Sequence, residues 1–158
     1  MMEEFMKLTV AVMVGVAMFA AIPASAQQDS APAPQQNEPA PPGLGEIMTL
    51  QQLRHIKLWF AGHAGNWPLA DYEVGELQEG FDDVNKLLGG DTVDKMVGAP
   101  MQALQKAIDD KNRATFTAAF DRLSAGCNNC HRTLDHAFIA IKRPTLLPYS
   151  NQSFAPSR

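Results

Sequence analysis

Cysteine is scarce in this sequence, because the chain of 158 residues contains only two, Cys127 and Cys130. A disulfide between residues so close together would close almost no loop and would constrain the unfolded chain little. A structural zinc site takes four ligands, and the sequence has no second Cys/His pair at matching spacing. The sequence therefore contains neither a disulfide framework nor a complete zinc motif.

The sequence also lacks a large excess of either positive or negative charge. The chain has 13 lysines and arginines against 17 aspartates and glutamates, and its formal net charge is −4. Nucleic-acid binding requires clustered Lys and Arg, so no nucleic-acid partner is expected. No nucleophile and base occur in a recognisable catalytic pattern, and we therefore do not expect an enzyme.

Long apolar runs are rare as well, and the one that stands out is Leu8 to Ala21, followed by Ile22-Pro23-Ala24-Ser25-Ala26. This layout is typical of a signal peptide, here residues 1–26 with cleavage after Ala26. The run is too short to cross about 30 Å of hydrocarbon. We therefore expect export to the periplasm without stable membrane insertion.

The rest of the chain divides by composition into three parts. Residues 27–43 are rich in Pro, Gln and Ala and should form a disordered linker, because they have too little apolar surface to bury. Residues 44–143 form one small domain, and residues 144–158 form a C-terminal extension without an assigned role.

Strict polar and apolar alternation is absent from the domain, so no strand is expected. Apolar residues instead recur every three or four positions, which predicts helices over residues 44–64, 69–88, 100–110 and 112–141. Residues 91–99 are expected to form a loop or short turn, with Pro100 opening the third helix. Four helices joined by short loops predict an all-α fold, an antiparallel four-helix bundle.

The helical spacing also predicts which side chains face the core. In the first helix these are Leu44, Ile47, Leu50, Leu53, Ile56 and Phe60, with Met48, His55, Trp59 and His63 on a neighbouring stripe. In the second they are Tyr72, Leu77, Phe81, Val84 and Leu88. In the fourth they are Phe116, Phe120, Leu123, Cys127, Cys130, His131, Leu134 and Phe138. Both cysteines and His131 are therefore expected on one inward face.

The sequence Cys127-Asn128-Asn129-Cys130-His131 contains Cys-X-X-Cys-His, the attachment signature of c-type haem. Two thiols at this spacing can each add to one vinyl group, while the adjoining imidazole reaches the iron from the same side. The motif predicts one covalent haem c, bound through Cys127 and Cys130, with His131 as the proximal iron ligand.

Other chemistries remain open for the two cysteines. A thioredoxin-like redox pair would need its first cysteine at a helix N-terminus, whereas Cys127 lies well inside a helical period. Zinc binding and a plain structural disulfide are the remaining alternatives.

A C-terminal helix with this motif after three upstream helices resembles the class II c-type cytochromes, the cytochrome c-prime group, over about residues 44–143. The stretches Arg54 to Gly62 and Asn66 to Ala70 also resemble a group of uncharacterised exported bacterial c-type cytochromes. In the c-prime group an aromatic residue and an arginine usually follow the motif after two residues. Leu134 and Asp135 occupy those positions here.

The resemblance implies a periplasmic cytochrome, a monomer or homodimer, that passes one electron between redox partner proteins. The alternative is a five-coordinate haem protein that binds nitric oxide or carbon monoxide. The ligand opposite His131 separates the two functions. His55 is the preferred sixth ligand and Met48 the alternative, while His63 and His136 are expected at the surface.

Charged residues could also contribute to the haem site, because cations bind propionates through charge-assisted hydrogen bonds. The cations considered are Arg54, Lys57, Arg132, Lys142 and Arg143. The alternative for each of them is an ordinary solvated side chain.

Overall fold

The structure is a computed structural model that describes residues 40–156. Within that range it contains four helices and no strand: α1 (Leu44–Ala64), α2 (Trp67–Leu88), α3 (Thr92–Asp109) and α4 (Arg113–Thr133). The predicted all-α fold with four helices is confirmed for these residues. The predicted signal peptide and residues 27–39 of the predicted linker lie outside the described residues.

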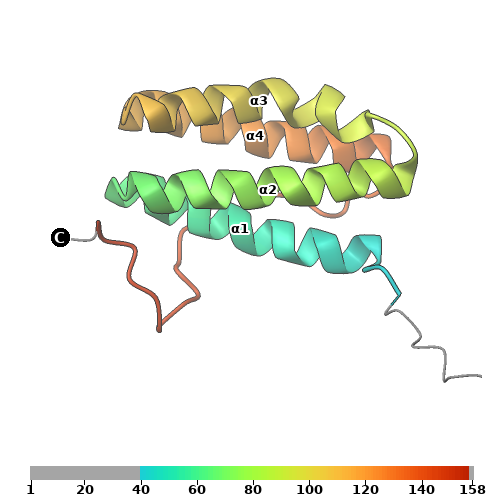
Figure 1. The fold of residues 1–158 in the computed structure, drawn as a ribbon. Coiled ribbons are helices and arrows are strands. Elements are labelled where there is room, and N and C mark those ends of the chain that lie inside the picture. The colour runs from blue at the N-terminus through green and yellow to red at the C-terminus, as the bar shows by residue number, and fades with distance from the viewer. Residues whose placement is uncertain (1–39, 157–158) are drawn as a thin grey trace, which may run out of the picture. The chain divides into compact units, whose positions relative to one another are not determined.

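Short turns join successive helices, so neighbours along the chain run in opposite directions (Figure 1). α1 packs closely on α2, and α3 packs closely on α4, whereas α1 and α4 pack together less extensively than either of these pairs. Because α1 and α4 also run in opposite directions, the start of α1 lies near the end of α4, where the Cys-X-X-Cys-His motif lies.

Local sequence explains where the helices begin and end. Gly65 and Gly89 close α1 and α2 with φ of 76° and 71°, a left-handed backbone that glycine adopts without steric cost. The Asn66 side chain accepts a hydrogen bond from Leu69 N–H at 3.3 Å and caps α2. Asn112 caps α4 in the same way, through Ala114 N–H and Thr115 N–H.

The core lies between the two helix pairs and is built mainly from large apolar side chains. Its fully buried members include Leu58, Leu77, Leu104, Phe116, Phe120 and Leu123. Gly62 lets α1 approach α4, because a Cβ at that position would lie 2.1 Å from the Phe116 ring. The aromatic rings of α4 therefore pack directly against the backbone of α1.

The predicted loop over residues 91–99 is wrong, because α3 already begins at Thr92 and continues through Pro100. Val93 and Val97 are buried at helical spacing with Met101, and this burial stabilises the earlier start. Asn85 adds a cap from α2, since its Oδ1 accepts from Val93 N–H at 3.0 Å.

Proline inside a helix leaves the carbonyl four residues earlier without its usual N–H donor, and for Pro100 this carbonyl belongs to Met96. Gly126 of α4 faces that same carbonyl, and a Cβ there would stand 2.6 Å from the Met96 oxygen. Pro100 and Gly126 thus act at one close crossing between α3 and α4.

The predicted core face of α1 is partly wrong. Leu50 and Leu53 are exposed, whereas Gln51 and His55 are buried. Gln51 occupies its buried position because its Nε2 donates to the carbonyl of Leu77 at 2.7 Å, which satisfies the amide inside the bundle. The buried face is therefore close to the neighbouring stripe that contains His55 and Trp59.

Two predicted core residues of α2 are also exposed, Tyr72 and Leu88. Leu77, Phe81 and Val84 are buried as expected. Ala70 and Glu73 beside Tyr72 are buried, so Tyr72 is exposed because it lies on the other face of α2, whereas Leu88 is exposed as the last residue of the helix.

The fourth helix ends at Thr133 rather than near Ile141, so its predicted end is wrong. Asp135 has φ of 60°, a left-handed conformation that aspartate tolerates better than most residues and that ends the helical path. Phe138, predicted to face the core, is 81% exposed. Residues 134–143, which we call the strap, leave the helix and turn back.

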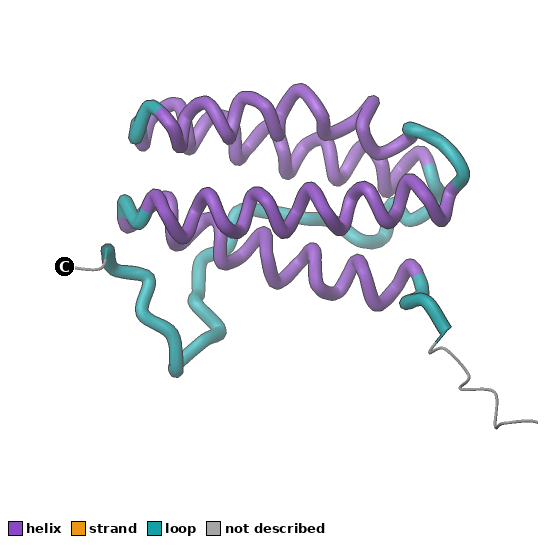
Figure 2. Tube along the Cα trace, viewed as in Figure 1, coloured by secondary structure: helices purple, strands orange, loops and turns teal. Residues whose placement is uncertain are grey.

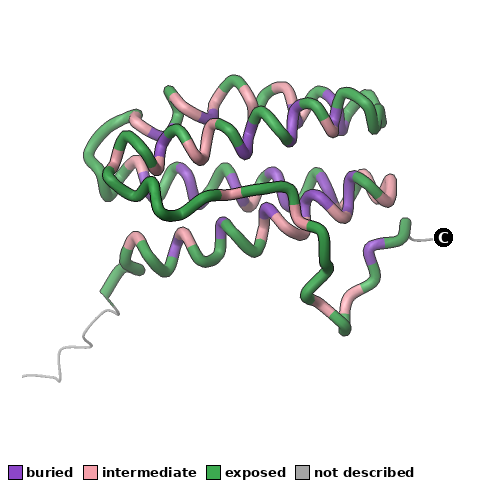
Figure 3. Tube along the Cα trace, turned by 180° about the vertical axis from the view of Figure 1, so that it is seen from behind, coloured by how far each residue is buried: buried purple, intermediate pink, exposed green. Residues whose placement is uncertain are grey.

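The strap runs as irregular chain along the bundle (Figures 2 and 3). At its end, Arg143 forms two hydrogen bonds to the Asp121 carboxylate and lies 4.6 Å from the centre of the Trp59 ring. Farther on, Phe154 is buried against Phe60, with ring centres 6.2 Å apart. The C-terminal extension is thus packed on the bundle. None of the helices within residues 40–156 is both long and apolar enough to span a membrane.

Candidate functional site

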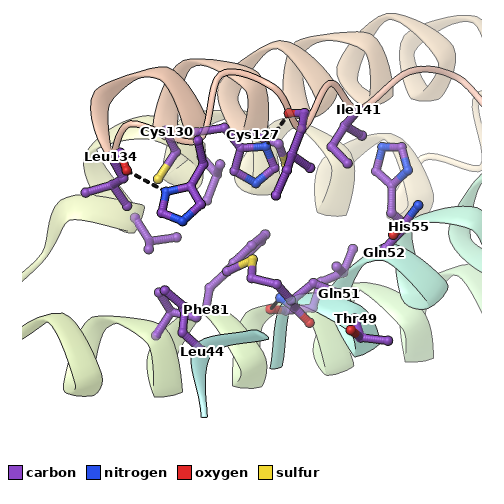
Figure 4. Close-up of a pocket in the computed structure, with 18 of the residues that line it drawn as sticks. Leu44, Thr49, Gln51, Gln52, His55, Phe81, Cys127, Cys130, Leu134 and Ile141 are labelled. Carbon is purple, nitrogen blue, oxygen red and sulfur yellow. Dashed lines mark hydrogen bonds between the residues drawn. The ribbon is translucent and has the colours of Figure 1, made fainter. Parts of the chain in front are cut away.

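A cavity of about 430 Å³ lies among the start of α1, the end of α4 and the strap (Figure 4). Its lining is mostly apolar and includes Leu44, Met48, His55, Leu77, Phe81, Val84, Val93, Val97, Leu123, Leu134, Ile139 and Ile141. Cofactor pockets in proteins typically measure roughly 300 to 1,000 Å³ and have this mainly apolar character. Its size and lining therefore suit a largely apolar ligand.

All three motif residues line this cavity. Cys127, Cys130 and His131 come from the last turns of α4, where the i, i+3 and i+4 positions share one face. The helical period thus brings together two thiols and one imidazole, as the sequence predicts. Both cysteines are free thiols rather than a disulfide.

The thiols are held in their neutral form. Burial, with a smaller contribution from the neighbouring Cys130, raises the pKa of Cys127 to about 12. Burial also raises the pKa of Cys130. A redox-active pair needs a stabilised thiolate, usually at a helix N-terminus, and these cysteines lie at the opposite end of α4. The site therefore speaks against thioredoxin-like chemistry.

His131 is oriented by the strap. Its Nδ1 lies 2.8 Å from the carbonyl oxygen of Ile139. A carbonyl oxygen can only accept, so Nδ1 carries a proton, and in the neutral ring Nε2 then keeps its lone pair. This is the usual state of a metal-binding histidine, whose second ring nitrogen donates to a carbonyl or carboxylate.

His55 also lines the cavity, but it already has a partner. It is 4% exposed, its Nε2 lies 2.8 Å from Ser124 Oγ, and its ring packs on Phe120 with centres 4.3 Å apart. Burial lowers the pKa of His55 to about 4, so the ring is neutral at pH 7. Ser124 Oγ donates in turn to the carbonyl of Phe120. This occupies the hydroxyl proton, and His55 Nε2–H is therefore the donor to Ser124.

The other candidate ligands lie at different places. Met48 is half-buried and lines the cavity. His63 is exposed and stacks on Trp59 outside the cavity, in agreement with its predicted surface position. His136 is exposed, as expected, but it also lines the cavity because α4 ends before it.

Three of the cations considered for propionate binding are paired with carboxylates of the protein. Arg54 lies 2.8 Å from Glu76, and Lys57 lies 3.0 Å from Glu73. Arg143 is bound by Asp121 as described above. Arg132 and Lys142 are exposed, and for the described residues no salt bridge joins either to a carboxylate.

Sequence reasoning missed the strap as a wall of the cavity, together with Ser124 and Asn128. Asn128 lies between the two cysteines, and its side chain hydrogen-bonds the backbone of Ile141 in the strap. Asp135 was the available signal, because aspartate is among the residues that most often adopt the left-handed conformation beyond a helix end. No sequence signal pairs Ser124 with His55, which lies 69 residues earlier.

Comparison with known proteins adds no evidence on the function of this site. No protein-family model, no curated protein and no solved structure matches the chain.

Proposed function

We propose that this chain is an exported c-type cytochrome that carries one covalent haem and transfers single electrons between redox partner proteins in the periplasm. The observation that carries the proposal is that Cys127, Cys130 and His131 line one mainly apolar cavity. The donor set suits haem: two neutral thiols for thioether bonds and one imidazole with a free Nε2 for iron. The resemblance to class II c-type cytochromes points the same way.

Each motif residue has a distinct task in this proposal. Cys127 and Cys130 would hold the macrocycle covalently, which prevents its loss after export. His131 would bind the iron through Nε2 while its Nδ1–H remains on Ile139. The haem, when bound, supplies a metal that alternates between ferric and ferrous states. The surrounding apolar side chains exclude water and so influence the potential of that couple.

His55 remains the proposed sixth ligand and Met48 the alternative. Both line the cavity on the α1 side, opposite the motif helix. For His55 to bind iron through Nε2, its hydrogen bond to Ser124 must first break. Met48 has no competing hydrogen bond among the described residues, but a thioether ligand gives a different spectrum and a higher potential.

The hydrogen bond between His55 and Ser124 also favours a second function, the binding of small gases. If that hydrogen bond persists in the haem-loaded protein and Met48 does not bind the iron, the iron would have no sixth ligand from the protein. The protein would then bind nitric oxide or carbon monoxide, as in the five-coordinate alternative.

Mass spectrometry tests the covalent attachment. The exported chain should be made in cells with haem-maturation machinery, and we expect a mass increased by one haem, with the leader removed after Ala26. The double variant Cys127→Ser/Cys130→Ser should lose this covalent mass. An exported wild-type chain with the mass of the polypeptide alone would refute the proposed function.

Visible spectra with and without carbon monoxide distinguish the two functions. A low-spin ferrous spectrum that carbon monoxide leaves unchanged supports the electron carrier. A high-spin spectrum that shifts with carbon monoxide supports the gas binder.

Variants of His55 test the identity of the sixth ligand. His55→Ala should change the spectrum and midpoint potential, with His63→Ala as the matched control on the same helix. If His55→Ala changes neither, His55 is not a ligand, and Met48→Ala is the next variant.

A further inference from the structure

Asn128, which lies between the two cysteines, forms hydrogen bonds to one residue of the strap, Ile141. Its Nδ2 donates to the carbonyl of Ile141 at 2.8 Å, and its Oδ1 accepts from Ile141 N–H at 2.7 Å. A carboxamide supplies a donor and an acceptor on separate atoms of one short side chain, so it can bind both backbone groups at once. Asn128 therefore fixes both backbone polar groups of Ile141 against α4.

The neighbouring part of the strap supplies the partner of His131. Ile139 lies two residues before Ile141, and its carbonyl accepts the Nδ1–H of His131 at 2.8 Å. From Ala137 to Lys142, the hydrogen bonds between α4 and the strap come from Asn128 and His131 alone among the described residues. On the N-terminal side, Ile139 is tied to α4 through a turn, because its N–H donates to the His136 carbonyl and His136 N–H donates to the His131 carbonyl. The Asn128 clasp fixes the strap on the C-terminal side of the Ile139 carbonyl.

We propose that Asn128 is a positioning residue for His131. By clasping Ile141, it keeps the Ile139 carbonyl on Nδ1, which sets the tautomer of the ring and leaves Nε2 for a metal. The inference rests on the proposed function only where it assigns iron to that Nε2. Hydrogen bonds of this kind orient metal ligands and raise their basicity. A more basic ligand stabilises ferric iron, so the clasp holds the midpoint potential down.

Two variants at Asn128 and one control test this role. Asn128→Leu keeps a similar size and removes both hydrogen bonds. Asn128→Asp keeps the acceptor for Ile141 N–H but places a carboxylate oxygen against the Ile141 carbonyl. Asn129→Ala is the matched control, because Asn129 belongs to the same motif, is exposed, and contacts Met96 and Arg132 rather than the strap.

The first measurement needs no haem. Nitrogen-15 NMR of the His131 ring, in residues 27–158 expressed in the cytoplasm without haem attachment, reports the tautomer directly. We expect the Nδ1–H form in the wild type and in Asn129→Ala, and a shift toward Nε2–H in both Asn128 variants. An Nε2–H ring in the wild-type chain would overturn the proposal whether or not the variants fold.

The second measurement uses the covalently loaded exported protein. At a fixed ambient potential, we expect the ferrous-to-ferric ratio to rise about ten-fold in the Asn128 variants, which equals about 59 mV for one electron. Asn129→Ala should keep the wild-type ratio. Loaded Asn128 variants with wild-type potential and wild-type tautomer would overturn the positioning role.

The two measurements also separate this inference from the proposed function. If the wild-type chain never acquires haem but the His131 tautomer changes in the Asn128 variants, the cytochrome assignment fails and the positioning role stands. If the wild-type chain acquires haem but neither the tautomer nor the potential changes in the Asn128 variants, the positioning role fails and the cytochrome assignment stands.

Discussion

Ser124 and His55 form a buried hydrogen bond between α4 and α1, with 2.8 Å between Oγ and Nε2. The bond satisfies a neutral imidazole that would otherwise lie unpaired among Phe120 and other apolar neighbours. The same nitrogen is the atom that His55 would offer to iron. One residue pair therefore links the stability of the bundle to the proposed sixth position.

Removing the hydroxyl with Ser124→Ala should destabilise the haem-free chain. His55 would be left with a buried donor and no partner, which costs about 1–3 kcal/mol. Urea unfolding followed by circular dichroism gives the free energy of unfolding. The exposed Ser150→Ala is the control and should leave it unchanged. Equal free energies for Ser124→Ala and the wild type would mean that the bond contributes nothing.

The haem-free chain should also lose stability in acid because of His55. Burial lowers the pKa of His55 from 6.5 to about 4 in the folded state, so the unfolded chain binds a proton first as the pH falls. The stabilisation is complete above pH 6.5 and is lost between pH 6.5 and about 4. It amounts to roughly 3 kcal/mol, at about 1.36 kcal/mol per pKa unit.

Urea unfolding at several pH values checks this prediction. His55→Gln should flatten the dependence in that window, whereas the exposed His63→Gln should retain it. A constant difference in free energy between His55→Gln and the wild type across the window would contradict the titration of His55.

Two glycine-to-alanine changes should act in opposite directions. In Gly126→Ala the new methyl group would stand 2.6 Å from the Met96 carbonyl oxygen, a backbone atom that cannot move aside cheaply. Strain of about 1–3 kcal/mol should outweigh the gain of about 1 kcal/mol in helix propensity. In Gly75→Ala, nothing lies within 4 Å, so the propensity gain should appear alone.

Thermal unfolding of both glycine variants measures the effect. We expect a lower Tm for Gly126→Ala and a higher Tm for Gly75→Ala. A higher Tm for both would show that α3 and α4 can separate at the Met96 crossing at little cost.

The C-terminal extension should contribute to stability through Phe154. This ring is 7% exposed and packs against Phe60, so Phe154→Ala should cost roughly 1.5–3 kcal/mol. Leu146→Ala lies in the same extension, is 82% exposed, and should change stability by less than about 0.5 kcal/mol. Equal urea midpoints for the two variants would mean that the extension does not stay on the bundle in solution.

The existence and type of the four helices follow from the sequence, because apolar residues at three- and four-residue spacing must bury one face together. The same period places Cys127, Cys130 and His131 on one face of α4, where the structure has them. Their spacing is local, within about one helical turn, so no tertiary information is needed to bring them together.

Where the helices begin and end, and which residues they bury, depended on tertiary interactions that the spacing of apolar residues does not reveal. Pro100 suggested a helix start, but the burial of Val93 and Val97 and the Asn85 cap extend α3 in front of it. Gln51 took a core position on α1 because the Leu77 carbonyl offered it a partner from another helix.

The sequence by itself thus determined the motif, the helical class of the fold and the side of α4 on which the motif lies. Only the tertiary structure decided what surrounds that motif. The hydrogen bond of His55 to Ser124, those between Asn128 and Ile141, and that of His131 to the Ile139 carbonyl all join residues that no local periodicity relates. Such hydrogen bonds form only after the helices are packed and the strap has turned back, because they depend on position in space rather than on order along the chain.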